Sequence, residues 1–144
     1  MVDFLGAPYP IVKTARGLLA TQTGIEQVKA DLLQLLLTNP GERVMLLGYG
    51  TPLRELIFEP NDAILASQAK EMIANSIATW EPRITVEQIE VLAEVDEASL
   101  NIDDLSQDSR EHILMIRILF FDPENIGDLQ ELKLEVPLAG TAGA

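Results

Sequence analysis

Carboxylates are the side chains with which this sequence could do the most chemistry. Its 144 residues include 23 Asp and Glu, a single His and no Cys. Without cysteine the chain lacks thiol nucleophiles, disulfides and thiolate metal ligands, and one imidazole, that of His112, cannot build a zinc site. No Gly-x-Ser-x-Gly elbow accompanies His112, which disfavours a serine hydrolase. We therefore expect no metal and no cofactor, and a structural or exposed His112.

Three glutamates beside Gly or Pro turns are the best candidates for acid–base catalysis: Glu42, Glu59 and Glu81. A glycosidase mounts two carboxyl groups several ångström apart and raises the pKa of one of them. The cleft of such an enzyme is usually lined with aromatic rings, and aromatic residues make up only 5% of this chain. Composition therefore favours solvated surface acids over a catalytic pair.

An acidic stretch at 96–111 offers oxygen ligands of the kind that calcium prefers. The candidates are Asp96, Asn101, Asp103, Asp104 and Asp108. Their spacing does not match the EF-hand, which alternates ligands and ends in glutamate at position 12. A solvated loop is the favoured interpretation. Likewise Gly48-Tyr49-Gly50 lacks the third glycine and the lysine of a phosphate-binding loop, and it predicts a turn.

The most informative local feature is Glu81-Pro82-Arg83, in which two charges flank a proline. On an extended chain residues i and i+2 project to one side, so the motif predicts a fixed charge pair directly after Trp80. From the residues alone we favour an internal role, in which the pair is completed by Arg43, Arg54 or Glu42. The alternative is an anchor for a partner protein, with geometric specificity from the arginine fork.

The net charge of −13 narrows the classes of partner. It argues against a protein that grips nucleic-acid phosphates or binds membranes through a polybasic surface. The acidity is uneven: the chain through Arg83 has nine acidic and seven basic residues, and the remainder has 14 and three. No apolar run approaches the roughly 20 residues of a membrane span, and the N-terminus lacks the features of a signal peptide. We expect a soluble chain that binds neither nucleic acid nor membrane.

Helices are predicted in the first half of the chain, after an N-terminal arm or hairpin at 1–22. A capping box of Thr23 and Glu26 starts the first helix, and Asn39-Pro40-Gly41 stops it. A short segment follows with apolar side chains at Leu53, Leu56 and Ile57. Asn61 or Asp62 can cap the next helix, which Pro82 ends. The helical part therefore covers residues 23–80.

Strands are predicted in the second half, at 84–136, before a tail at 137–144. Residues 84–95 alternate, with a change of phase near Glu87-Gln88 that indicates a β-bulge. Residues 113–121 are apolar on both faces except at Arg117, as expected for the most buried strand. Leu132, Leu134 and Val136 alternate with polar residues and predict a half-exposed edge strand. The order is that of a single-domain α+β fold, an N-terminal arm and helices packed on an antiparallel β-meander.

Four motifs in order give the sequence a family resemblance. They are Leu36-Leu37-Thr38-Asn39-Pro40-Gly41-Glu42-Arg43, Tyr49-Gly50, Leu56-Ile57-Phe58-Glu59-Pro60 and Trp80-Glu81-Pro82-Arg83-Ile84. In this order and spacing they resemble the small baseplate wedge, or sheath-initiator, proteins of contractile phage tails. That family includes the equivalent component of type VI secretion baseplates. The resemblance covers residues 14–95.

The resemblance implies a structural component of the inner baseplate, not an enzyme. Six copies around the tail tube would link wedge subunits to the first sheath ring, in a virion tail baseplate assembled in the host cytoplasm. Glu81, Pro82 and Arg83 would dock on the helical bundle of the wedge subunits, with Glu42, Arg43 and Tyr49 alongside. The meander would resemble the sheath protein's interlocking domain and accept sheath strands at Leu132, Leu134 and Val136. Tail tube and hub proteins are further candidate partners.

One rival function comes from the same resemblance, because some relatives carry a lysozyme-like label. The alternative is then a peptidoglycan-cleaving hydrolase that uses paired carboxylates. A phage tail, a secretion system and an injection particle share the structural mechanism, and the sequence does not separate them.

Overall fold

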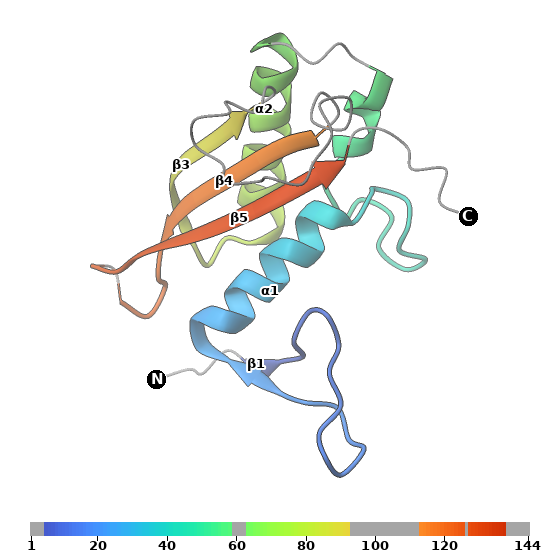
Figure 1. The fold of residues 1–144 in the computed structure, drawn as a ribbon, viewed down its shortest axis with the longest axis vertical. Coiled ribbons are helices and arrows are strands. Elements are labelled where there is room, and N and C mark those ends of the chain that lie inside the picture. The colour runs from blue at the N-terminus through green and yellow to red at the C-terminus, as the bar shows by residue number, and fades with distance from the viewer. Residues whose placement is uncertain (1–4, 59–62, 93–112, 126, 138–144) are drawn as a thin grey trace, which may run out of the picture.

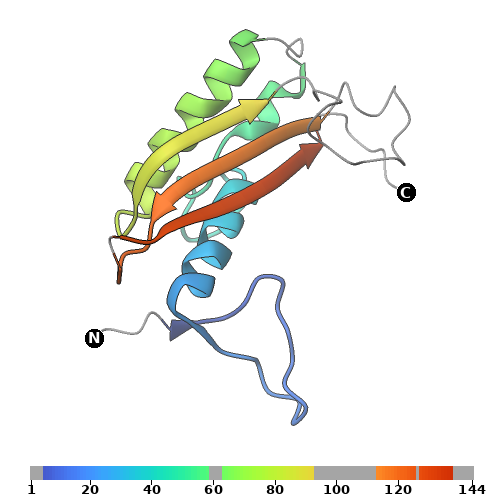
Figure 2. The same ribbon diagram turned by 60° about the vertical axis from the view of Figure 1, so that its left-hand side comes forward.

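The computed structural model describes residues 5–58, 63–92, 113–125 and 127–137. Two helices lie on one side of a three-stranded antiparallel sheet, and a hairpin projects from the N-terminal end (Figures 1 and 2). The predicted α+β class is confirmed. In chain order the elements are β1 (Leu5–Gly6), β2 (Gln22–Thr23), α1 (Gly24–Leu37), η1 (Leu53–Phe58), α2 (Ala63–Trp80), β3 (Thr85–Leu92), β4 (Ile113–Phe121) and β5 (Leu129–Pro137).

The N-terminal segment is a hairpin. β1 pairs antiparallel with β2 at the base of the hairpin. Nearer its tip, an isolated antiparallel bridge joins Lys13 to Leu19. This pairing explains why the predicted capping box is wrong. Thr23 lies in β2 opposite Leu5 and makes no side-chain capping bond, while Glu26 pairs with Lys29 instead, at 3.8 Å.

Helix α1 buries one apolar side, formed by Val28, Leu32, Leu35 and Leu36. Its last turn is closed at Thr38, whose N–H and hydroxyl both donate to the carbonyl of Gln34. The helix thus ends directly before Asn39-Pro40-Gly41, as predicted. The spacing of the leucines, every three or four residues, is what gives the helix a face to pack on the sheet.

Helix α2 buries a stripe with a spacing of four residues: Leu65, Ala69, Ile73 and Ile77. It packs beside β3 and contacts η1 and α1. Figure 2 shows α2 running along the sheet on the side where α1 also lies. The helix ends at Trp80, where the N–H of Glu81 still donates to the carbonyl of Ile77.

The sheet has the order β3-β4-β5, with β4 in the centre. The side chains of β4 that face the helices are fully buried, namely Leu114, Ile116, Ile118 and Phe120. The register between β3 and β4 shifts between Val86 and Gln88, which confirms the predicted bulge. Within the described residues β3 and β5 each pair with β4 alone, so β5 is an edge strand as expected.

A charged ladder crosses the face of the sheet that points away from the helices. Arg117 of β4 donates to Glu131 of β5 and pairs with Glu90 of β3 at 3.1 Å. The hydrogen bond from Arg117 lowers the pKa of Glu131, and the pKa of Arg117 is raised by Glu131 and then by Glu90. The single charge in an otherwise apolar strand thus ties all three strands together.

Several sequence predictions fall outside the described residues. They concern His112, Glu59, the caps Asn61 and Asp62, the acidic stretch at 96–111 and all but the first residue of the tail predicted at 137–144. That first residue, Pro137, is the last residue of β5. In the part of the chain that is described, none of the helices is both long and apolar enough to cross a membrane.

Candidate functional site

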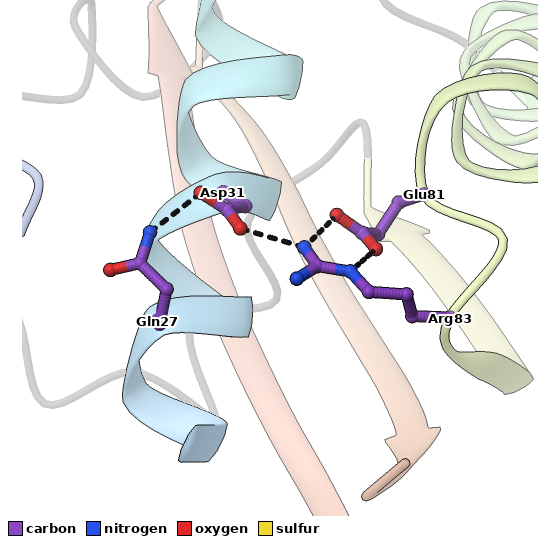
Figure 3. Close-up of polar contacts among 4 residues, drawn as sticks. All are labelled: Gln27, Asp31, Glu81 and Arg83. Atoms are coloured by element: carbon purple, nitrogen blue, oxygen red, sulfur yellow. Dashed lines mark hydrogen bonds and ion pairs between the residues drawn. The ribbon is translucent and has the colours of Figure 1, made fainter. Parts of the chain in front are cut away.

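The charge pair predicted from Glu81-Pro82-Arg83 is present at the junction of α2 and β3. The guanidinium of Arg83 donates through Nε and Nη2 to the two carboxylate oxygens of Glu81 (Figure 3). Pro82 and Arg83 lie in a turn. The sequence predicted an extended chain at this point; instead, the turn brings the two side chains together. This fork-on-carboxylate geometry fixes the side chains in both distance and angle.

The pair is completed from α1 by Asp31. Arg83 Nη2 lies 2.7 Å from Asp31 Oδ2, and the other oxygen of Asp31 accepts a hydrogen bond from Gln27 at 2.7 Å. The network of Gln27, Asp31, Glu81 and Arg83, drawn in Figure 3, therefore joins α1 to the end of α2. The predicted internal partners of the pair were Arg43, Arg54 or Glu42, and the partner found is Asp31.

Burial differs among the charged groups of this network. The side chain of Glu81 is 8% exposed, whereas those of Arg83 and Asp31 are each 30% exposed. The hydrogen bond to Glu81, followed by that to Asp31, raises the pKa of Arg83 above its ordinary value, although burial acts in the opposite direction. A guanidinium between two carboxylates stays charged, and the Arg83 side chain is partly exposed.

An aromatic pair lies next to the network. The rings of Trp80 and Tyr49 meet edge to face, with centroids 5.4 Å apart, and the guanidinium of Arg43 lies 4.2 Å from the centre of the Tyr49 ring. Burial raises the pKa of Tyr49, and the charge of Arg43 opposes that rise. Arg43 and Tyr49, two of the predicted partner-binding residues, are thus brought beside Trp80, the residue that precedes Glu81.

The loop that carries Arg43 and Tyr49 is clamped to both helices. Gly50 has φ +128°, and a Cβ added there would lie 2.3 Å from the carbonyl oxygen of Thr38. The next residue, Thr51, donates from its N–H to that same carbonyl at 2.9 Å. Ser76 of α2 donates to the carbonyl of Gly50 at 3.2 Å. Only glycine lets the chain pass this close, so the position of Tyr49 depends on Gly50.

Glu42 lies apart from this network. Its carboxylate accepts the N–H of Asn39 at 3.0 Å and pairs with Arg54 at 3.3 Å. The side chains of Glu42 and Arg54 are 43% and 63% exposed. Glu42 therefore stabilises its own turn, and the structure places it on the surface of the loop.

The predicted residues of β5 are mainly core residues. Leu132 and Val136 are buried and Leu134 is half-buried, all facing the helices. The side chains that alternate with them, Glu131 and Glu135 among them, are exposed. A partner that adds a strand at β5 would therefore contact its backbone edge and not the three apolar side chains named from the sequence.

The two described candidates for acid–base catalysis both have arginine partners, Glu81 with Arg83 and Glu42 with Arg54. No group of three or more His, Cys, Asp or Glu that could hold a metal ion occurs among the described residues. A groove between α2 and β3 has Glu81 in its lining, but most of the lining is apolar. The site is thus a preformed charged and aromatic surface.

Together these features define a small α+β protein in which polar groups hold the two helices, the loop before Gly50 and the turn between α2 and β3 in fixed relation. The chain belongs to the family described as baseplate wedge protein gp25, whose model matches residues 22–118. It is 32% identical to baseplate protein W of Escherichia phage P2 over 69 residues, which are 48% of this chain and 60% of that protein. The match thus spans less than two thirds of the phage protein.

Solved structures share the fold. A protein described as a putative tail lysozyme from Geobacter sulfurreducens aligns with a TM-score of 0.63 and 19% identity, over 81% of this chain and 93% of that one. A chain of the anti-feeding prophage baseplate, solved as a 6-fold symmetrised assembly, aligns with a TM-score of 0.61 and 20% identity, over 98% and 90%. At such identities these likenesses concern the fold alone.

Proposed function

We propose that this chain is a structural component of the inner baseplate of a contractile tail, where it links wedge subunits to the first sheath ring and initiates sheath polymerisation. The observation that carries the proposal is the Glu81–Arg83 pair, held by Asp31 at a partly exposed position in a chain of the baseplate wedge family. The proposal includes no enzymatic activity.

The wedge-facing surface in this proposal consists of Arg83, Arg43 and Tyr49, all of them partly exposed. Because Glu81 and Asp31 already hold the guanidinium, a partner loses little side-chain entropy when it binds there. The Arg43–Tyr49 stack adds a flat, cationic surface next to it. Such a surface suits a helical partner that presents carboxylates and apolar side chains, and we assign that role to the helical bundle of the larger wedge subunits.

The sheath-facing surface is the edge of β5. An edge strand offers unpaired N–H and C=O groups to which an extended segment of another protein can add. β5 is nine residues long, and within the described residues only β4 pairs with it. A head-to-tail contact that does not close on itself propagates as a helix, which is what the first ring must start.

The same proposal places residues 1–144 as one wedge domain in the virion tail baseplate, assembled in the host cytoplasm. Six copies per baseplate agree with the 6-fold symmetry applied to the anti-feeding prophage baseplate. Tail tube and hub proteins would lie close enough to be additional contacts.

A peptidoglycan hydrolase is the rival, because one structure with this fold is described as a putative tail lysozyme. A cell-wall clearing assay with purified chain and with Glu81→Gln separates the two functions. We expect neither protein to clear cell walls. Clearing by the original chain that is lost in Glu81→Gln would establish the hydrolase and refute the structural proposal.

Co-purification with the wedge subunits tests the anchor directly. Arg83→Ala should fold but fail to bind them, because the partly exposed guanidinium that the partner contacts is gone. Asp31→Asn keeps the Arg83–Glu81 pair and should still bind, and the exposed Arg54→Ala serves as the control. Equal loss of binding in Arg83→Ala and Asp31→Asn would mean that the network only supports the fold, and normal binding by Arg83→Ala would remove the anchor.

A further inference from the structure

The N-terminal hairpin carries apolar side chains that do not pack on its own core. Ile11, Val12, Leu18 and Leu19 are 69%, 52%, 67% and 64% exposed. The tip is nevertheless well formed. The N–H of Thr14 donates to the carbonyl of Leu18 at 2.7 Å. A folded hairpin that presents four large apolar side chains to solvent is suited to insertion into a complementary surface.

The base of the hairpin is fixed to the body of the protein. β1 pairs with β2, which leads directly into α1. A Cβ at Gly6 would lie 2.4 Å from the side chain of Gln27, so the hairpin backbone contacts α1 closely. Figures 1 and 2 both show residues beyond this point projecting away from the sheet. The hairpin is therefore an outward arm with a defined direction.

A groove of about 500 Å³ lies between α2 and β3, on the edge of the sheet opposite β5. Its lining is mainly apolar and includes Ala74, Ile77 and Ala78 of α2 together with Val86 and Ile89 of β3. Within the described residues β3 pairs only with β4, so its outer edge can accept another strand. The bulge between Val86 and Gln88 falls within this groove.

Charge complements the apolar match. The described hairpin region, residues 5–23, contains Lys13 and Arg16 and no carboxylate. The groove is lined by two carboxylates, Glu81 and the exposed Glu87, and by one cation, Lys70 of α2. Attraction between the cationic hairpin tip and Glu87, at the bulge of β3, favours this contact over one between two hairpins.

From these observations we propose that the hairpin of one copy docks in the α2–β3 groove of a second copy, with the hairpin adding to the edge of β3. The two surfaces differ, so the contact is heterologous and can run from copy to copy around a ring. It goes beyond the proposed function, because it concerns a contact between copies of this chain. The groove adjoins the anchor through Glu81 and Pro82, but it includes neither Arg83 nor the edge of β5 that we assign to the sheath.

The absence of cysteine from the sequence makes a specific cross-linking test possible. Chains with Leu18→Cys on the hairpin are mixed with chains that carry Ala78→Cys in the groove, under mild oxidation. We expect a mixed disulfide dimer, identified by mass labels on the two chains. The control pairs Leu18→Cys with Lys133→Cys on β5, whose side chain is 67% exposed. A yield no higher than that of the control pair would overturn the proposal.

Self-association provides the second measurement. Light scattering over a concentration series should show oligomers of the original chain that Leu18→Asp with Leu19→Asp abolishes. Val44→Asp, at a side chain that is 87% exposed on another loop, should leave them unchanged. A chain that stays monomeric throughout, or equal losses from the hairpin and Val44 variants, would contradict docking of the hairpin.

Discussion

Arg83 links two segments that lie far apart in the sequence. Its partner Glu81 could be predicted, because Glu81 lies only two residues away and carries the opposite charge. Asp31 could not be predicted as a partner, because it lies 52 residues earlier, on α1, whereas Arg83 lies in the turn after α2. The one local hint was the pair Gln27 and Asp31, which are spaced by one turn of α1 and hydrogen-bond to each other. Which distant charge completes a pair depends on the packing of helices, which no local pattern specifies.

The first prediction at this scale concerns stability. Arg83→Met should destabilise the chain by about 2–3 kcal/mol, because it leaves the buried carboxylate of Glu81 without its cation. Urea unfolding measures this loss. The exposed pair gives the control, since Arg54→Met should cost less than about 1 kcal/mol. Equal costs for the two variants would show that the Glu81–Arg83 network is no more than a surface ion pair.

A second prediction concerns pH. The hydrogen bond from Arg117 lowers the pKa of Glu131 in the folded chain. The stabilisation from this pair is therefore complete above the pKa of an unfolded glutamate, and it is lost as the pH falls through the lower folded value. In Arg117→Gln the carboxyl of Glu131 should titrate at higher pH by NMR. A pKa that is the same in both proteins would contradict the ladder across the sheet.

At the scale of elements, alternation and turn residues predicted most of the sheet. The phase change near Glu87-Gln88 identified a bulge that the register confirms. The central position of residues 113–121 followed from their apolar character on both faces. The capping box failed because Thr23 takes part in a hairpin with residues 5–6, and pairing with a strand about 17 residues upstream competes with a local cap. Local signals predicted where helices and strands form, but they did not predict which of two competing interactions a residue makes.

The loop that holds Tyr49 gives a prediction at this scale. Gly50→Ala should cost more than about 2 kcal/mol, because it combines a positive φ with a collision against the carbonyl of Thr38. Gly41 also has a positive φ, +93°, but open space around a new Cβ, so Gly41→Ala should cost only about 1 kcal/mol. Thermal unfolding of both variants tests this. A similar loss in both would show that the clamp at Gly50 does not hold the loop.

At the scale of the whole molecule, the net charge of −13 is distributed unevenly along the chain. The described hairpin is cationic, and the chain from Ile84 onward carries the excess of carboxylates. Like charges on the sheets of free copies oppose sheet-to-sheet association, while opposite charges favour the docking of a hairpin on a strand. The sequence predicted the uneven charge. It could not predict the groove beside β3, because that groove forms only where α2 packs next to an edge strand.

The most direct test of the structural role is a structure of this chain within an assembled baseplate, together with its wedge and sheath subunits. The account predicts that a wedge subunit contacts Arg83 and Tyr49 and that a sheath strand pairs with the edge of β5. If Arg83 faces solvent in that assembly and β5 remains without a sheath strand, the proposed link between wedge and sheath is wrong.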